Sequence, residues 1–96
     1  MMHSSSLPAL VKFHSKTCGS CQTMENIIKE LKLKFGNSIN FISIDVDEHL
    51  PIAEYFDVKS VPTFILINNE VQIWRKSGLI SKKEFSDLLK QQLDLL

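Results

Sequence analysis

Two cysteines separated by two residues, Cys18 and Cys21, are the side chains of this sequence best suited to chemistry. They are its only cysteines, and a pair this close in sequence cannot form the disulfide framework of a small secreted fold. Such a pair cycles between dithiol and disulfide, binds a metal ion, or packs inertly. The first interpretation requires one sulfur that is accessible and ionised near neutral pH.

The residues after Cys18 predict a helix that begins at this cysteine. One side is apolar and the other is charged, at helical spacing. The apolar side carries Cys21, Met24, Ile27, Ile28, Leu31 and Phe35, and the charged side carries Glu25, Lys29, Glu30, Lys32 and Lys34. We expect Gly36 and Asn37 to end the helix in a left-handed turn.

A cysteine at a helix start is a strong candidate nucleophile, because unpaired N–H groups and the helix dipole favour its thiolate. A thiol with the ordinary pKa of about 8.5 is roughly 3% ionised at pH 7, whereas a pKa of about 7 makes it half ionised. We expect Cys18 to attack a target disulfide and Cys21, one turn later, to resolve the mixed disulfide. Gly19 allows a tight turn beside the nucleophile, and Ser20 leaves room for a substrate.

Val61 and Pro62 form a second candidate element, at the head of a predicted strand where a proline is tolerated. A cis bond there would leave the backbone of Val61 unpaired and turned toward the cysteines, so that an extended substrate segment adds like a short strand. Cis is the minority form of any X-Pro bond, and the sequence leaves both isomers open.

The remaining pattern predicts an α/β fold in the order βα-βα-ββ-α, with a four-stranded mixed sheet flanked by helices. Residues 7–13 read as a buried strand and 39–46 as a strand parallel to it. A short helix follows over 52–56, capped by Asp47. Asn68 and Asn69 separate strands 64–67 and 71–74, and a capping box of Ser81 and Glu84 opens the last helix. We expect residues 1–6 to be a disordered tail and 7–96 a single domain.

The composition argues against several partner classes. Eleven lysines and arginines balance 11 acids, and no basic run favours nucleic acid or an anionic membrane surface. No apolar stretch is long enough for a signal peptide or a membrane span. With the cysteine usage, this makes a cytoplasmic location the expectation.

These motifs resemble the thioredoxin family. The segment Thr17-Cys18-Gly19-Ser20-Cys21 resembles its active site, Val61-Pro62-Thr63-Phe64 its cis-proline loop, and Gly78 the glycine after its last strand. The resemblance covers roughly residues 8–93. It implies a thioredoxin-like fold, reduction of protein disulfides with a thioredoxin reductase-type electron donor, and no cofactor. It also implies a substrate-binding surface of Thr17, Gly19, Ser20, Val61, Pro62 and Gly78.

Several positions depart from the family pattern. Lys12 stands where thioredoxins usually have a buried carboxylate, and His14 and Thr17 stand where tryptophans are common. A cation near Cys21 would favour its thiolate; alternatively, Lys12 extends past the sheet edge to water. His14 could move a proton near the cysteines, or serve only in packing. The chain also begins too late for the family's first strand and helix, so we expect a monomer whose strand 41–46 is an exposed edge and a candidate dimer surface.

Three other functions stay open at this stage. A glutaredoxin-like use of glutathione is disfavoured, because Ser60 replaces the threonine of a Thr-Val-Pro motif and no Gly-Gly pair follows the hairpin. A non-catalytic binding module would use the same groove without turnover. A metal site would need four ligands, of which the cysteines supply two, and we expect none.

Overall fold

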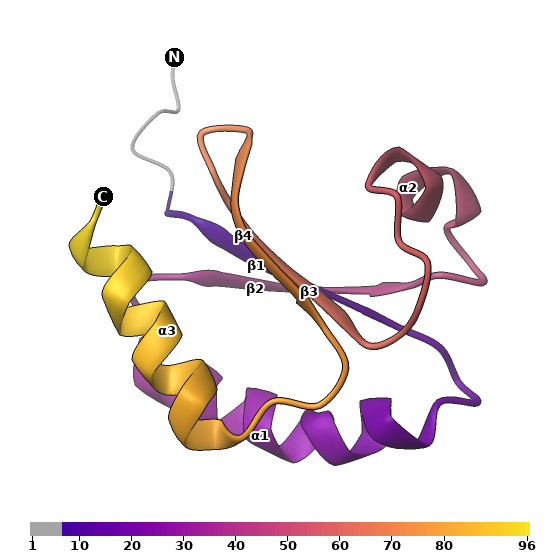
Figure 1. Ribbon diagram of the computed structural model, residues 1–96, viewed down its shortest axis with the longest axis horizontal. Coiled ribbons are helices and arrows are strands. Elements are labelled where there is room, and N and C mark those ends of the chain that lie inside the picture. The colour runs from indigo at the N-terminus through magenta and orange to yellow at the C-terminus, as the bar shows by residue number, and fades with distance from the viewer. Residues whose placement is uncertain (1–6) are drawn as a thin grey trace.

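The computed structural model describes residues 7–96, which form the predicted α/β fold (Figure 1). The expected disordered tail at 1–6 lies outside the described residues. The elements follow the predicted order βα-βα-ββ-α: β1 (Ala9–His14), α1 (Gly19–Phe35), β2 (Asn40–Asp45), α2 (Leu50–Tyr55), β3 (Thr63–Asn68), β4 (Val71–Ser77) and α3 (Lys82–Asp94).

The four strands form one mixed sheet in the order β2-β1-β3-β4. β1 runs parallel to β2 and antiparallel to β3, and β3 and β4 form an antiparallel hairpin. The register pairs Phe13 with Thr63, and Thr63 with Ser77. The end of β1, the start of β3 and the end of β4 therefore lie at the same end of the sheet.

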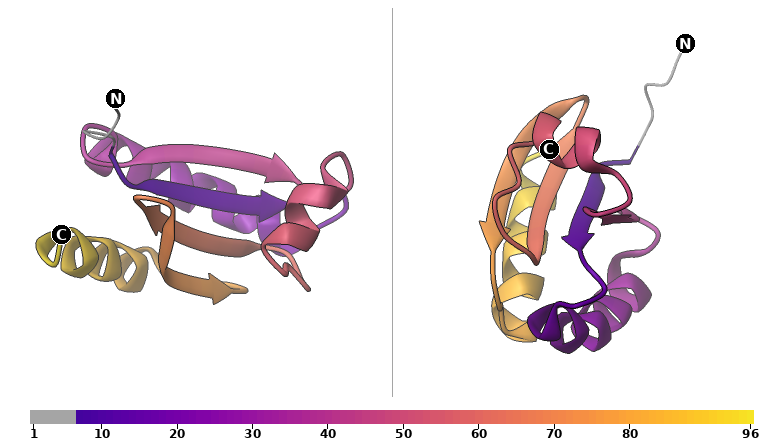
Figure 2. Two further views of the ribbon diagram at one scale, coloured as in Figure 1. Left: turned by 90° about the horizontal axis from the view of Figure 1, so that it is seen from above. Right: turned by 90° about the vertical axis from the view of Figure 1, so that its right-hand side faces the viewer.

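Helices cover both faces of the sheet, and alternate residues of β1 supply both cores. Leu10 packs with core residues of α1 and α3, whereas Val11 and Phe13 pack with residues that include Phe56, directly after α2. The two further views show the helices arranged about the sheet (Figure 2). The predicted burial of the first strand is confirmed, since residues 10–13 are all buried. The larger core lies between the sheet and the two long helices and contains Leu10, Met24, Leu31, Phe35, Ile39, Phe64, Leu66, Ile80, Phe85 and Leu89.

The predicted left-handed end of the first helix is wrong. Gly36 has a φ of −61° and continues the right-handed turn of α1. Glycine fits this position because of a close approach instead: a Cβ there would lie 2.6 Å from the backbone oxygen of Lys32. The chain leaves the helix through a tight turn in which the N–H groups of Ser38 and Ile39 both donate to the oxygen of Phe35.

Two other local predictions are shifted. The left-handed residues of the hairpin are Asn69 and Glu70, one position later than expected, because β3 extends through Asn68. The α2 helix begins after His49, without a side-chain cap. Asp47 does not cap it, because it lies two residues before the N-cap position, in the turn after β2 where its N–H donates to Asp45 Oδ1.

Ser81 caps α3 as expected, with its Oγ accepting the N–H of Glu84 at 3.1 Å. β2 is an edge strand of the described sheet, in agreement with the sequence, and Ile42 on it is 45% exposed. Within residues 7–96, no helix combines the length and the apolar character needed to cross a membrane.

Candidate active site

Cys18 is the N-cap residue of α1. Its backbone is extended, and its Sγ accepts a hydrogen bond from the backbone N–H of Cys21 at 3.0 Å. A capping side chain satisfies one of the N–H groups that the first helical turn leaves unpaired. A thiolate at this position would accept the same bond more strongly, because hydrogen bonds to charged acceptors are shorter and stronger than neutral ones. Cys18 is partly exposed, in contrast to the buried Cys21.

Cys21 lies one turn into α1 and is buried, with 4% of its surface exposed. It forms a disulfide with Cys18, and the two Cα atoms are 5.2 Å apart. The pair therefore has the asymmetry expected of a nucleophile and a resolving thiol. Beside it, Thr17 and Gly19 are exposed, and the Ser20 hydroxyl lies 3.5 Å from Cys18 Sγ.

The loop before β3 holds the second predicted element. The bond between Val61 and Pro62 is cis, Pro62 is fully buried and Val61 is partly exposed. The next residue, Thr63, fixes the loop because its hydroxyl donates to the backbone oxygen of Ser60 at 2.7 Å. Thr63 Oγ1 also lies 2.7 Å from the hydroxyl of Ser77 on β4.

Gly78, the residue directly after β4, is hydrogen-bonded to this loop. Its φ is +91°, a conformation that side chains rarely adopt, and its N–H donates to the backbone oxygen of Pro62 at 2.8 Å. Because β1, β3 and β4 end or begin at one end of the sheet, the loop that leads to Cys18, the Pro62 loop and Gly78 share that end.

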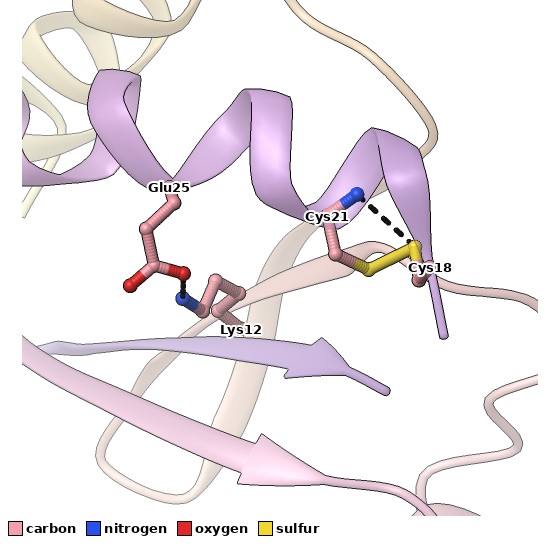
Figure 3. A network of polar contacts seen from close by, with 4 residues as sticks. All are labelled: Lys12, Cys18, Cys21 and Glu25. Carbon is pink, nitrogen blue, oxygen red and sulfur yellow. Dashed lines mark hydrogen bonds and ion pairs between the residues drawn. A yellow bond between two sulfur atoms is a disulfide. The ribbon is translucent and has the colours of Figure 1, made fainter. Parts of the chain in front are cut away.

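Lys12 lies beneath α1. Its side chain is 10% exposed, and its Nζ is 3.2 Å from Oε2 of Glu25, which is half-exposed. The alternative that Lys12 extends past the sheet edge is wrong, because β1 is an inner strand and the ammonium turns toward the helix (Figure 3). The Lys12 hydrogen bond and charge hold the pKa of Glu25 below its ordinary value.

His14 is the last residue of β1 and is partly exposed, with Asp45 as its register partner on β2. Its imidazole makes no side-chain hydrogen bond within the described residues, so its expected part in proton transfer stays a prediction. For a metal, the part of the chain that the structure describes holds no cluster of three or more His, Cys, Asp or Glu side chains. The two sulfurs thus lack further protein ligands there.

Glu25 is the site residue that the sequence interpretation missed, because it was assigned to the solvent side of the helix. Two signals point to it in retrospect. Glu25 is four residues after Cys21, which places both on one side of α1, and a lysine in a buried strand needs a carboxylate within reach.

Comparison with known proteins agrees with this site. The family model described as Thioredoxin matches residues 1–91. Thioredoxin Y, chloroplastic, from Oryza sativa subsp. japonica is 28% identical over 95 residues, which are 99% of this chain and 56% of that protein. The thioredoxin of Borreliella burgdorferi is 29% identical over 83 residues, covering 86% of this chain and 71% of that protein.

Among solved structures, a mutant thioredoxin from Halobacterium salinarum NRC-1 superposes with a TM-score of 0.87 at 28% identity, covering 97% of this chain and 80% of that one. The chain spans little more than half the length of the rice protein. A family match over nearly the whole sequence and a cysteine pair joined at the start of α1 support thiol-disulfide oxidoreductase activity in general. On these grounds, the chain belongs to the thioredoxin family.

Proposed function

We propose that this chain reduces disulfide bonds of other proteins through a dithiol-disulfide cycle, with Cys18 as the nucleophile and Cys21 as the resolving thiol. The observation that carries the proposal is the N-cap position of Cys18, a partly exposed residue whose sulfur accepts the N–H of Cys21 at 3.0 Å. The buried Cys21 is one turn away and already within disulfide reach.

The cycle begins with the reduced protein. The Cys18 thiolate attacks one sulfur of a target disulfide, so that a Cys18–target bond forms and the target bond breaks. The other target sulfur leaves with the electron pair and takes a proton from water. The Cys21 thiolate then attacks Cys18 Sγ and releases the second target sulfur as a thiolate. The target gains two electrons, and the protein ends with the Cys18–Cys21 disulfide present in the structure.

We assign substrate binding to the surface between the cysteines and the Pro62 loop. An extended target segment would pair with the backbone of Val61, with Gly78 on its other side and Thr17, Gly19 and Ser20 around the sulfur. A donor of the thioredoxin reductase type would return two electrons to the disulfide. The monomer is the unit that acts, in a reducing compartment such as the cytoplasm, where the dithiol form persists.

Reduction of insulin disulfides tests the proposal. The wild type should accelerate reduction with dithiothreitol, and with a thioredoxin reductase and NADPH, whereas Cys18→Ser should be inactive in both assays. A wild type as inactive as Cys18→Ser would refute the proposal. If that inactive protein carried zinc or iron, a metal-binding function would be the better explanation. If Cys18→Ser kept full affinity for a cellular partner, a non-catalytic binding module would be the better explanation.

A further inference from the structure

Lys12 is the only buried cationic side chain within residues 7–96. Burying an ammonium is unfavourable unless a partner compensates for its lost hydration. The partner here is the Glu25 carboxylate at 3.2 Å, which is itself half-exposed. Water screens the half-exposed carboxylate more than it screens the buried ammonium. The positive charge of Lys12 is therefore only partly compensated on the side that faces the protein interior.

The buried side chain nearest to this pair along α1 that can ionise is the resolving thiol. Cys21 and Glu25 are four residues apart, so their Cβ atoms are about 5–6 Å apart on one side of the helix. Figure 3 shows the Lys12 side chain rising from β1 to meet Glu25 one turn beyond Cys21. Cys21 and Lys12 are both buried, so charge acts between them with little screening by water.

We propose that Lys12 and Glu25 form an opposed charge pair that sets how readily Cys21 ionises: the ammonium stabilises the Cys21 thiolate, and the carboxylate limits that stabilisation. The inference rests on the proposed function, in which Cys21 must ionise to resolve the mixed disulfide. It extends that function by assigning Glu25 a part and by giving the two charges opposite signs of effect.

The other charged or titratable groups near this end of α1 do not offer the same effect. Lys16, before Cys18, is exposed and pairs with Glu48 at 3.0 Å. The side chains from β2 and the Pro62 loop are uncharged where they adjoin Lys12 or the cysteines, namely Ser43, Val61 and Pro62. The groups left lie on three elements. His14 ends β1, and its register partner Asp45 on β2 accepts the backbone N–H groups of Asp47 and Glu48. Lys29 and Lys32 on α1 are exposed to water and line the cavity beside Glu25.

The pair acts through charge and not by accepting the proton of Cys21. The hydrogen bond from Lys12 lowers the pKa of Glu25, which makes its carboxylate a poor base. A surface cavity of about 220 Å³ between α1 and the first two strands is lined by both Lys12 and Glu25. That volume holds several waters, which hydrate the half-exposed Glu25 carboxylate. Cys21 does not line this cavity, and the proton that it loses passes to bulk water. The thiolate then attacks Cys18 Sγ, and the bond from Cys18 to the target breaks.

A single-thiol protein tests the inference without any need for catalysis. In Cys18→Ser only Cys21 ionises, and the pH at which it is half ionised is measured from its thiolate absorbance and from its alkylation rate. Adding Lys12→Met should raise this pH by about one to two units, as expected for a unit charge some 6–8 Å away at an effective dielectric constant near 20. Adding Glu25→Gln should lower it, by about half to one unit because Glu25 is half-exposed.

Three controls separate charge from structure. Lys12→Arg keeps the charge and should leave the half-ionisation pH close to that of Cys18→Ser. The double change Lys12→Met with Glu25→Gln should bring it back toward that value. Glu30→Gln makes the same substitution on the same helix nine residues after Cys21, about 13 Å along the axis, and should not move it. If the two residues acted only on the structure, Lys12→Met and Glu25→Gln would shift the half-ionisation pH of Cys21 in the same direction, or would not shift it at all.

In the complete dithiol protein, Lys12→Met should slow resolution of a mixed disulfide at pH 7 by about three- to tenfold, since a weaker acid ionises less but attacks somewhat faster. If Lys12→Met does not fold, the result for Glu25→Gln decides alone, since this change lies at a half-exposed position. The expected result is a lower half-ionisation pH of Cys21. An unmoved or raised half-ionisation pH in Glu25→Gln would overturn the inference. Insulin reduction by the wild type is scored separately, so that failure of the proposed function and failure of this charge effect give different results.

Discussion

The three glycines of this chain should respond to alanine substitution in three different ways, because the structure gives each a different reason to lack a side chain. Gly78 has a φ of +91°, and a Cβ there would meet nothing within 4 Å. Gly19 also has open space around a Cβ, but it has no positive φ and begins α1. Gly36 has ordinary helical geometry, but a Cβ would lie 2.6 Å from the oxygen of Lys32.

The expected size of each effect follows from these contacts. Gly78→Ala should lower the free energy of unfolding by about 1–3 kcal/mol, since an L side chain is strained at that φ. The Gly78 N–H bond to Pro62 prevents the backbone from relaxing freely. Gly36→Ala should cost about 1–3 kcal/mol through overpacking. Gly19→Ala should raise stability by about 0.4–1 kcal/mol, because alanine reduces the freedom of the unfolded chain.

Urea unfolding of the oxidised proteins, followed by the fluorescence of the single tryptophan, measures these differences. In a domain of this size, each kcal/mol should move the melting temperature by about 4–8 °C. Gly78→Ala should also lower insulin reduction more than Gly36→Ala does, because only Gly78 adjoins the Pro62 loop. Equal stability of Gly78→Ala and Gly19→Ala would refute the reasoning, since the two sites differ in backbone angle and not in space.

Three further predictions concern contacts that hold the site and its frame. Ser81→Ala should cost about 1 kcal/mol in urea unfolding through loss of the α3 cap, whereas Ser81→Thr, which keeps a hydroxyl that can accept the same hydrogen bond, should cost less. Thr63→Val should lower the free energy of unfolding by about 1–3 kcal/mol and slow insulin reduction, because the buried Thr63 hydroxyl bonds to Ser60 and Ser77 and so holds the Pro62 loop. Ser77→Ala should lower the free energy of unfolding less, and an equal loss of stability in the two variants would contradict this. Glu25→Gln should be less stable than wild type by under about 1 kcal/mol at pH 6, and this difference in the free energy of unfolding should disappear as the pH falls below 4.5. The reason is that the folded state lowers the pKa of Glu25. The Glu25 carboxylate therefore stabilises the folded protein above its ordinary pKa, and this stabilisation is lost as the folded carboxyl is protonated. A gap that widens in acid, measured by urea unfolding across pH 3–6, would contradict that sign.

The order of elements was predictable from sequence because each strand and helix carries its own period. The short apolar run before His14 favours a strand buried on both faces, and Ser81 with Glu84 marks a helix start without reference to the rest of the chain. The helical period of apolar residues that begins after Cys18 likewise predicts that the cysteines lie at a helix start. These features depend on residues close together in sequence.

Features that depend on contacts between distant residues were not predictable in the same way. Nothing in the sequence selects Glu25 over other acids as the partner of Lys12, because that choice depends on where α1 crosses β1. The cis form of Val61-Pro62 was open for the same reason. The shifted hairpin has a local cause: either Asn68 or Asn69 tolerates left-handed geometry, and only the length of β3 decides that Asn69 and Glu70 adopt it.

The most direct test of the central claim is which cysteine bonds covalently to a target when its partner is removed. Cys21→Ser, reacted with a disulfide-bonded peptide at pH 7, should accumulate one adduct by mass spectrometry, and peptide mapping should locate it at Cys18. Cys18→Ser, in which Cys21 is buried, should form that adduct at least tenfold more slowly. Comparable adduct formation by the two variants, or an adduct only through Cys21, would contradict the assignment of Cys18 as the attacking sulfur.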